Sequence, residues 1–173
     1  MIMISNLEIT DKLNTYKIKY ELIEHEAFFT VEDSAKKRGQ IKGAHTKNLF
    51  FKNKKDQFVL FSCLENAEIN IKKFSKSTGY KNLSFAKENY LDKILGILPG
   101  SVSPFALLND TSHQVSFYLE EELYNSEFVN FHPLVNTSTI NLKTKDFLSF
   151  MIKNKKKIHI FSLKNDLVFK IYE

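Results

Sequence analysis

The sequence feature that most constrains the fold is a pair of apolar runs joined by a short polar turn. Residues 49–51 and 58–64 consist of Leu, Phe, Val, Ser and Cys, and the turn 53–56 between them reads Asn-Lys-Lys-Asp. Runs rich in Phe and Val favour strands, and a four-residue polar turn between two such runs indicates an antiparallel hairpin. The chain must therefore build a sheet that includes this hairpin.

Helix and strand signals follow one another irregularly along the rest of the chain. The pattern of apolar residues and end signals predicts helices at residues 5–14, 30–39, 70–77, 87–95 and 144–154. It predicts further strands at 16–23, 83–85, 105–108, 115–119, 128–131, 138–142 and 157–163, with 105–108 and 115–119 as a second hairpin. The proposed N-caps are Ser5, Thr30 and Thr144, and the proposed helix stops are Gly39 and Gly96. This irregular order predicts a mixed α/β (α+β) fold with helices around a mixed sheet.

The whole chain, residues 1–173, is expected to form a single domain. A chain of 173 residues is long enough to bury a core without disulfides or metals. No Pro-, Gly- or Ser-rich linker and no internal repeat divides it.

Charge points weakly to a polyanionic partner. The net charge is +5, and lysines gather at residues 52–55 and again at 72–81. Lysines clustered in this way can follow a phosphate backbone, whereas the alternative is a merely solvated face.

Cys63 is the only cysteine, so no intramolecular disulfide can form. It lies inside the apolar run 58–64 with no charged neighbour in sequence, which favours a buried thiol over a nucleophile. The chain has neither a signal peptide at its start nor an apolar run long enough to cross a bilayer. We expect a cytoplasmic protein that does not interact with membranes.

Lys47 is the first candidate site residue. It opens the otherwise apolar strand 49–51, where its methylenes can pack on the sheet while the ammonium group reaches a cleft. A cation there can neutralise phosphate or stabilise charge on an ester carbonyl oxygen. Taken alone, a lysine at a strand start is more often a solvated edge residue.

The second candidate is the loop 100–104, Gly-Ser-Val-Ser-Pro, between a helix and a strand. Gly100 permits a positive φ, and Pro104 stiffens the exit without contributing an amide hydrogen. The remaining amides of Ser101, Val102 and Ser103 can be directed at a carbonyl or an oxyanion. A plain turn is the alternative for this pattern in isolation.

The third candidate is the stretch 131–137. His132 precedes Pro133 and is therefore biased towards an extended backbone, and Asn136 offers a donor and an acceptor. We favour binding of a substrate amino group or lining of a small pocket over proton transfer, with a purely structural histidine as the alternative.

Other chemistry finds no support in the sequence. His25 and His45 lack metal-like spacing, so we expect neither a metal nor a cofactor. The run Glu120-Glu121-Glu122 is interpreted as a helix face rather than an acid/base pair. Ser101 and Ser103 are not in a nucleophile elbow, and the chain has no nucleotide-binding glycine fingerprint.

Taken together, the strings at residues 43–50, 100–104 and 131–137 resemble the free-standing aminoacyl-tRNA editing domains related to the insertion domain of bacterial prolyl-tRNA synthetase. The resemblance covers about residues 20–163. It implies a curved, largely antiparallel mixed sheet that forms an incomplete barrel, and hydrolysis of a mischarged aminoacyl-tRNA ester by positioning, with water or a ribose hydroxyl taking part. The resemblance assigns Lys47 as the catalytic residue. It assigns substrate binding to Thr46, Asn48, Phe50, Gly100, Ser101, Val102, Ser103, Pro104, Leu108, His132 and Asn136.

Within this family, the strings at 45–50 and 131–137 resemble the branch that removes alanine from tRNA for proline. Removal of cysteine or of several small amino acids stays open, as does a non-catalytic module that binds tRNA or an amino acid. The implied partners are the acceptor end of the tRNA and, as a further candidate, prolyl-tRNA synthetase; we expect a monomer. A pocket for alanine must exclude proline by size, with Phe50, Leu108 and Val135 as candidate walls.

Overall fold

The computed structural model describes residues 3–27 and 41–173, so the helix predicted at 30–39 lies outside the described residues. Within them, nine strands form one mixed sheet in the order β1-β7-β6-β2-β3-β5-β8-β9, with β4 also paired to β2. The strands are β1 (Tyr20–Glu24), β2 (Ala44–Lys52), β3 (Phe58–Leu64), β4 (Ser84–Phe85), β5 (Val115–Glu120), β6 (Phe128–Phe131), β7 (Ser138–Lys143), β8 (Ile158–Ser162) and β9 (Leu167–Tyr172). The predicted mixed α/β class is confirmed, and the sheet does not close into a barrel.

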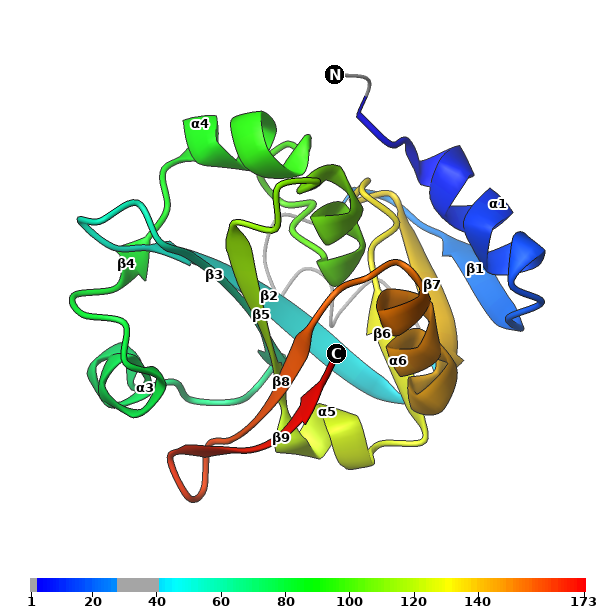
Figure 1. The fold of residues 1–173 in the computed structure, drawn as a ribbon. Coiled ribbons are helices and arrows are strands. Elements are labelled where there is room, and N and C mark those ends of the chain that lie inside the picture. Colours follow the sequence, from blue (N-terminus) through cyan, green and yellow to red (C-terminus); the bar gives the residue numbers. More distant parts are fainter. Residues whose placement is uncertain (1–2, 28–40) are drawn as a thin grey trace.

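Helices surround this sheet (Figure 1). They are α1 (Asn6–Thr15), α3 (Ile71–Thr78), α4 (Glu88–Tyr90), the π-helical turn η1 (Leu91–Leu95), the 3-10 helix η2 (Pro104–Asn109), α5 (Glu121–Asn125) and α6 (Thr144–Lys153). Ser5 caps α1 as predicted, because its hydroxyl accepts from the Glu8 amide while the Glu8 carboxylate accepts from the Ser5 amide. The predicted cap of α6 is wrong: Lys143 occupies the N-cap position and makes no side-chain cap. None of the helices in the described ranges is long and apolar enough to span a bilayer.

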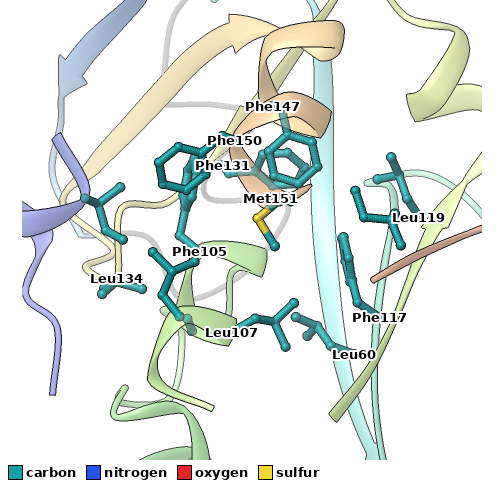
Figure 2. Close-up of a cluster of buried hydrophobic side chains, with 14 of the residues drawn as sticks. Leu60, Phe105, Leu107, Phe117, Leu119, Phe131, Leu134, Phe147, Phe150 and Met151 are labelled. Carbon is teal, nitrogen blue, oxygen red and sulfur yellow. The ribbon is translucent and has the colours of Figure 1, made fainter. Parts of the chain in front are cut away.

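Side chains along the central hairpin point alternately to the two faces of the sheet, which creates one hydrophobic cluster on each face. Phe50 and Leu60 point into the main core, which also receives side chains from α1, α6, η1 and η2. Figure 2 shows Phe105 of η2 facing Phe147 and Phe150 of α6 across this core. A second cluster on the other face contains Phe51, Phe61 and Cys63 of the hairpin, Phe74 of α3 and Phe161 of β8.

The predicted hairpin between β2 and β3 is confirmed, and Asn53 organises its turn. The Asn53 side chain accepts from the amides of Lys55 at 2.9 Å and Gln57 at 3.1 Å, and donates to the Gln57 side chain at 2.6 Å. Asp56 takes a positive φ of 56°. A single buried amide side chain thus satisfies the polar groups of the turn.

The second predicted hairpin is wrong. Residues 105–108 belong to η2 rather than to a strand, and β5 runs parallel to β3 on one side and to β8 on the other. Short apolar runs fit a buried helix as well as a strand. Ser103 followed by Pro104 was the signal for a helix start, because Ser103 is the N-cap and accepts from the Phe105 amide at 3.3 Å. Strand β9 was not predicted.

Candidate active site

Within the described residues, one edge of strand β2 is only partly paired. One edge pairs with β3 from Thr46 to Lys52, while the other pairs with β6 at Ala44 and His45 and with β4 at Phe51 and Lys52. Between those two short pairings, no strand of the described chain pairs with β2. The Phe50 carbonyl faces this side, where it accepts from the Ala86 amide at 2.9 Å. Because backbone groups alternate in direction along a strand, Asn48 also directs its N–H and C=O to this edge.

Lys47 lies within this segment, with its side chain on the face of the second cluster. Its register partner is Cys63, so both side chains share that face. The Lys47 ammonium donates to the Ala67 carbonyl just after β3. The lysine is half-buried, which means that its charge is partly withdrawn from water while it remains within reach of a ligand.

Two further ionisable groups share this face with Lys47. Burial raises the pKa of the Cys63 thiol to about 12, with the charge of Glu120 adding to the effect and that of Lys47 opposing it. Cys63 is buried in β3, as predicted. Burial likewise raises the pKa of the Glu120 carboxyl, while the hydrogen bond from the Leu64 amide lowers it. Sequence reasoning missed Glu120, because it reads there as part of an acidic helix face.

Thr46, Asn48 and Phe50 point to the opposite face of the hairpin. The Thr46 hydroxyl donates to the Asn130 carbonyl of β6 at 2.7 Å, which ties the two strands together. The Asn48 side chain accepts from the Ser62 hydroxyl of β3 at 2.6 Å. Phe50 is buried and stacks on Phe58 with ring centroids 5.7 Å apart. Their role in binding substrate stays a prediction.

The 100–104 loop has the backbone that its sequence predicts. Gly100 takes a φ of +84°, and Ser101 and Ser103 are buried. The Ser101 amide donates to the Leu98 carbonyl at 3.1 Å. Within the described part of the chain, the amides of Val102 and Ser103 have no protein acceptor, so they are the donors that this loop can offer a ligand.

Asn109, the last residue of η2, and Asp110 after it anchor the end of this helix. Asn109 donates to the Leu95 carbonyl at 2.8 Å and accepts from the Ile4 amide at 2.6 Å. The buried Asp110 carboxylate accepts from the Val115 amide at 2.8 Å, and its carbonyl accepts from the Lys156 ammonium at 2.7 Å. These contacts explain why the polar pair follows an apolar run.

His132 follows β6 and lies beside His25. The His132 Nδ1 donates to the Ser138 carbonyl at 2.8 Å, and the two imidazole centroids are 5.8 Å apart. Because a carbonyl only accepts, Nδ1 carries the proton, and Nε2 is the acceptor of the neutral ring. Burial lowers the pKa of His132, and the nearby His25 lowers it further, while the bond to Ser138 opposes this shift.

The rest of the 131–137 stretch borders a hollow beside α1. Pro133, Val135 and Thr137 line it together with His25, and its volume is about 400 Å³. Leu134 takes a φ of +68° with a buried side chain, a conformation that costs a non-glycine residue free energy and often occurs at functional sites. Asn136 is half-buried.

The predicted site residues thus divide between two faces of β2. Lys47 lies on one face, whereas Thr46, Asn48 and Phe50 share the other with the core that receives η2 and Leu108. The partly paired edge of β2 separates the two groups. Across the described residues, His, Cys, Asp and Glu side chains form no group of three that could hold a metal ion.

Comparison with known proteins gives a consistent result. The model of the aminoacyl-tRNA editing domain matches residues 25–150. The chain is 34% identical over 149 residues to the mouse prolyl-tRNA synthetase associated domain-containing protein 1, covering 83% of this chain and 88% of the relative. It is 35% identical over 136 residues to the prolyl-tRNA editing protein ProX of Acetoanaerobium sticklandii, covering 78% of this chain and 83% of the relative.

A solved structure described as a candidate trans-editing enzyme for prolyl tRNA synthetase has the same fold. Its TM-score is 0.65 at 18% identity, and the match covers 91% of this chain and 96% of the other. At that identity, the likeness shows the fold alone. The matched family model spans the Lys47 strand, the 100–104 loop and His132. The chain therefore belongs to the aminoacyl-tRNA editing domain family.

Proposed function

We propose that this protein hydrolyses the ester of mischarged tRNA for proline in trans, with alanine as the amino acid removed. As a member of this family the chain is an enzyme, an aminoacyl-tRNA hydrolase. The relative named as a prolyl-tRNA editing protein, ProX, supports the tRNA assignment. The observations that carry the proposal are the half-buried Lys47 on the partly paired strand β2 and the unused amides of Val102 and Ser103 in a loop opened by Gly100.

In this proposal the substrate ester lies across the partly paired edge of β2. Lys47 approaches it from one face and the loop from the other. The ammonium of Lys47 can leave the Ala67 carbonyl for a phosphate or for the developing oxyanion, both of which are stronger acceptors. Such a cation stabilises the charge that grows on the carbonyl oxygen in the transition state.

The loop contributes hydrogen-bond donors of fixed direction. The amides of Val102 and Ser103 follow the positive φ of Gly100 and precede Pro104, which has no amide hydrogen. Two successive donors held by a buried loop stabilise an oxyanion without reorganising during the reaction.

His132 suits the amino end of the substrate. A neutral imidazole with its Nδ1 proton bound to Ser138 presents Nε2 as an acceptor, and the α-ammonium of an aminoacyl ester is a donor. This is a binding role and requires no proton transfer.

The choice of alanine rests on the resemblance of the strings at 45–50 and 131–137 to the alanine-removing branch. A small pocket bounded by Phe50, Leu108 and Val135 would exclude proline by steric overlap. Favourable contacts with one or two extra methylenes would distinguish alanine from proline by only about 1–3 kcal/mol.

Replacement of Lys47 by alanine tests the mechanism. We expect single-turnover hydrolysis of alanyl-tRNA for proline to slow by about 100-fold, because the loss of one group that stabilises transition-state charge has a cost of this order. The rate of loss of radiolabelled alanine from the tRNA measures it.

Lys19→Ala is the matched control, since Lys19 is exposed and lies between α1 and β1, away from β2. An unchanged rate in Lys47→Ala, with Lys19→Ala also unchanged, would remove Lys47 from the mechanism.

Specificity requires a panel of alanyl, cysteinyl, seryl and prolyl esters on one tRNA. Fast loss of alanine with prolyl-tRNA left intact supports the proposal, and preferential loss of cysteine would reassign the amino acid. Tight tRNA binding without hydrolysis of any ester would instead indicate a binding module.

A further inference from the structure

The end of the β2–β3 hairpin remote from Lys47 carries two adjoining hollows lined by lysines. The first, of about 610 Å³, lies along α3 and includes Lys72, Lys76 and Lys81. The second, of about 550 Å³, includes Lys52, Lys54 and Lys87. Asn82 lines both, so the hollows adjoin; neither lining, as described, includes an acidic side chain. We call these six lysines with Asn82 and Phe85 the basic surface.

The lysines of the basic surface are mostly not neutralised within the fold. Lys52 pairs with Asp56, and the neighbouring Lys73 approaches Asp166 at 3.5 Å. Among the ion pairs of the described residues, none involves Lys72, Lys76 or Lys81. Lys72 and Lys76 are four residues apart on one face of α3, a spacing at which like charges destabilise a helix.

An exposed aromatic ring lies among these lysines. Phe85 of β4 lines the second hollow and is 61% exposed, although its ring contacts the buried Phe51 with centroids 5.0 Å apart. In the same hollow, Lys52 lies over the Tyr90 ring at 5.1 Å. Lysines that neutralise phosphates, combined with exposed rings on which bases stack, are typical of surfaces that bind single-stranded or structured RNA.

The basic surface lies at a suitable distance from Lys47. Lys47 and Lys52 both lie in β2, and the five residues that separate them span about 17 Å at the usual rise. The aminoacyl group of a charged tRNA sits at the tip of its single-stranded 3′ end. A few unpaired nucleotides can bridge this distance, which would bring the acceptor stem onto the basic surface while the ester lies at the edge of β2.

We infer that the basic surface is the docking site for the acceptor stem and 3′ strand of the tRNA, an inference that rests on the proposed function. It binds phosphates through Lys72, Lys76 and Lys81, and stacks an unpaired base on Phe85. This surface supplies affinity for the RNA, whereas the β2 edge supplies the chemistry.

The test compares two triple variants with equal loss of charge. The first is Lys72→Gln, Lys76→Gln and Lys81→Gln. The control, Lys19→Gln, Lys145→Gln and Lys153→Gln, removes three exposed lysines near α1 and α6, on the other side of the molecule (Figure 1). Fluorescence anisotropy gives the Kd for uncharged tRNA at several salt concentrations.

For the first triple variant we expect affinity at 0.1 M salt to fall by on the order of 100-fold. The slope of log K against log salt should become less steep by about two to three. The control should keep at least most of the affinity and slope. Equal Kd and slope in the first variant and the wild type, or an equal loss in the control, would overturn the inference.

A minimal substrate separates this inference from the proposed function. An alanyl ester of adenosine alone is too short to extend from the β2 edge to the basic surface. The first triple variant should hydrolyse it at the wild-type rate, which also shows that the variant is folded, while kcat/KM for alanyl-tRNA falls with the affinity. If the wild type hydrolyses neither ester, the proposed function fails. The comparison of Kd values would still show whether the basic surface binds tRNA.

Phe85 provides an independent variant. Phe85→Leu keeps an apolar contact with Phe51 but loses the flat ring, and we expect tRNA to bind about tenfold more weakly. Phe85→Tyr keeps the ring and should bind as the wild type does. Equal binding by Phe85→Leu and Phe85→Tyr would exclude the stacking role.

Discussion

At the scale of single residues, the surroundings of His132 affect its protonation. Burial and the neighbouring His25 depress its pKa below the ordinary 6.5, and its Nδ1 is bound to the Ser138 carbonyl. Near neutral pH the ring is therefore an acceptor that suits a substrate ammonium. Protonation would replace this acceptor with a like charge.

We predict that KM for the alanyl ester rises as pH falls through the depressed pKa of His132, and that an NMR titration of the ring has its midpoint below 6.5. Stability should decline in the same window, because the unfolded chain binds the proton first. His132→Gln should lose the acidic rise in KM. A midpoint at or above 6.5 would contradict this environment.

The pKa of Glu120 is shifted in the opposite direction to that of His132. Burial raises its pKa, so in the folded protein the ionised form is disfavoured relative to the unfolded chain. Its contribution to stability is present below the ordinary pKa of 4.5 and is lost as pH rises through the raised value. Gln keeps an oxygen that can accept from the Leu64 amide.

We therefore predict that Glu120→Gln becomes more stable relative to the wild type as pH rises from 4 to 7. Urea unfolding at several pH values gives the two free energies of unfolding. A difference that stays constant with pH, or that changes in the other direction, would show that Glu120 is not held in a low-dielectric site.

At the scale of elements, the approach of β2 to β6 depends on Gly43. Its φ is +89°, and a Cβ at this position would lie 2.6 Å from the Phe128 Cβ and 2.7 Å from the Phe128 carbonyl oxygen. Gly79 also has a positive φ, of +79°, but nothing lies within 4 Å of its Cβ position. Alanine substitutions at Gly43 and Gly79 therefore distinguish the cost of backbone strain from the cost of overpacking.

Gly43→Ala should lower the free energy of unfolding by roughly 2–5 kcal/mol, because a left-handed conformation and a clash with backbone add. Gly79→Ala should cost about 1–2 kcal/mol from strain alone. Chemical denaturation of both variants measures the difference. Equal losses would mean that β6 moves aside and that the contact does not fix its position.

Local signals predicted most elements for physical reasons that can be named. The β2–β3 hairpin has a polar turn with Asn53 at its centre, α1 has a capping box, and α3 ends at Gly79 in the left-handed conformation. In contrast, the run 105–108 has no periodicity that separates helix from strand. Parallel pairing of β3, β5 and β8 joins segments far apart in sequence, and no local pattern encodes it.

At the scale of the whole molecule, sequence placed the candidate residues on elements but not on faces. Side chains alternate between the two faces of β2, so Lys47 lies on the face opposite to Thr46 and Asn48. Which loops meet each face depends on the register of the whole sheet, and a local pattern does not give it. Glu120 illustrates this limit, because it meets Leu64 across 56 residues of chain. The resemblance to a family supplied the grouping that local patterns could not.

The bond between Asn109 and Ile4 carries a practical consequence for the laboratory. Through one amide side chain, the first turns of the polypeptide are linked to the segment that bears Gly100. An affinity tag fused upstream of Ile4, or trimming of the leading residues, would disturb that anchor and could reach the 100–104 loop of the candidate site without touching it. Kinetic work on this enzyme is therefore best done with fusions at the carboxyl end.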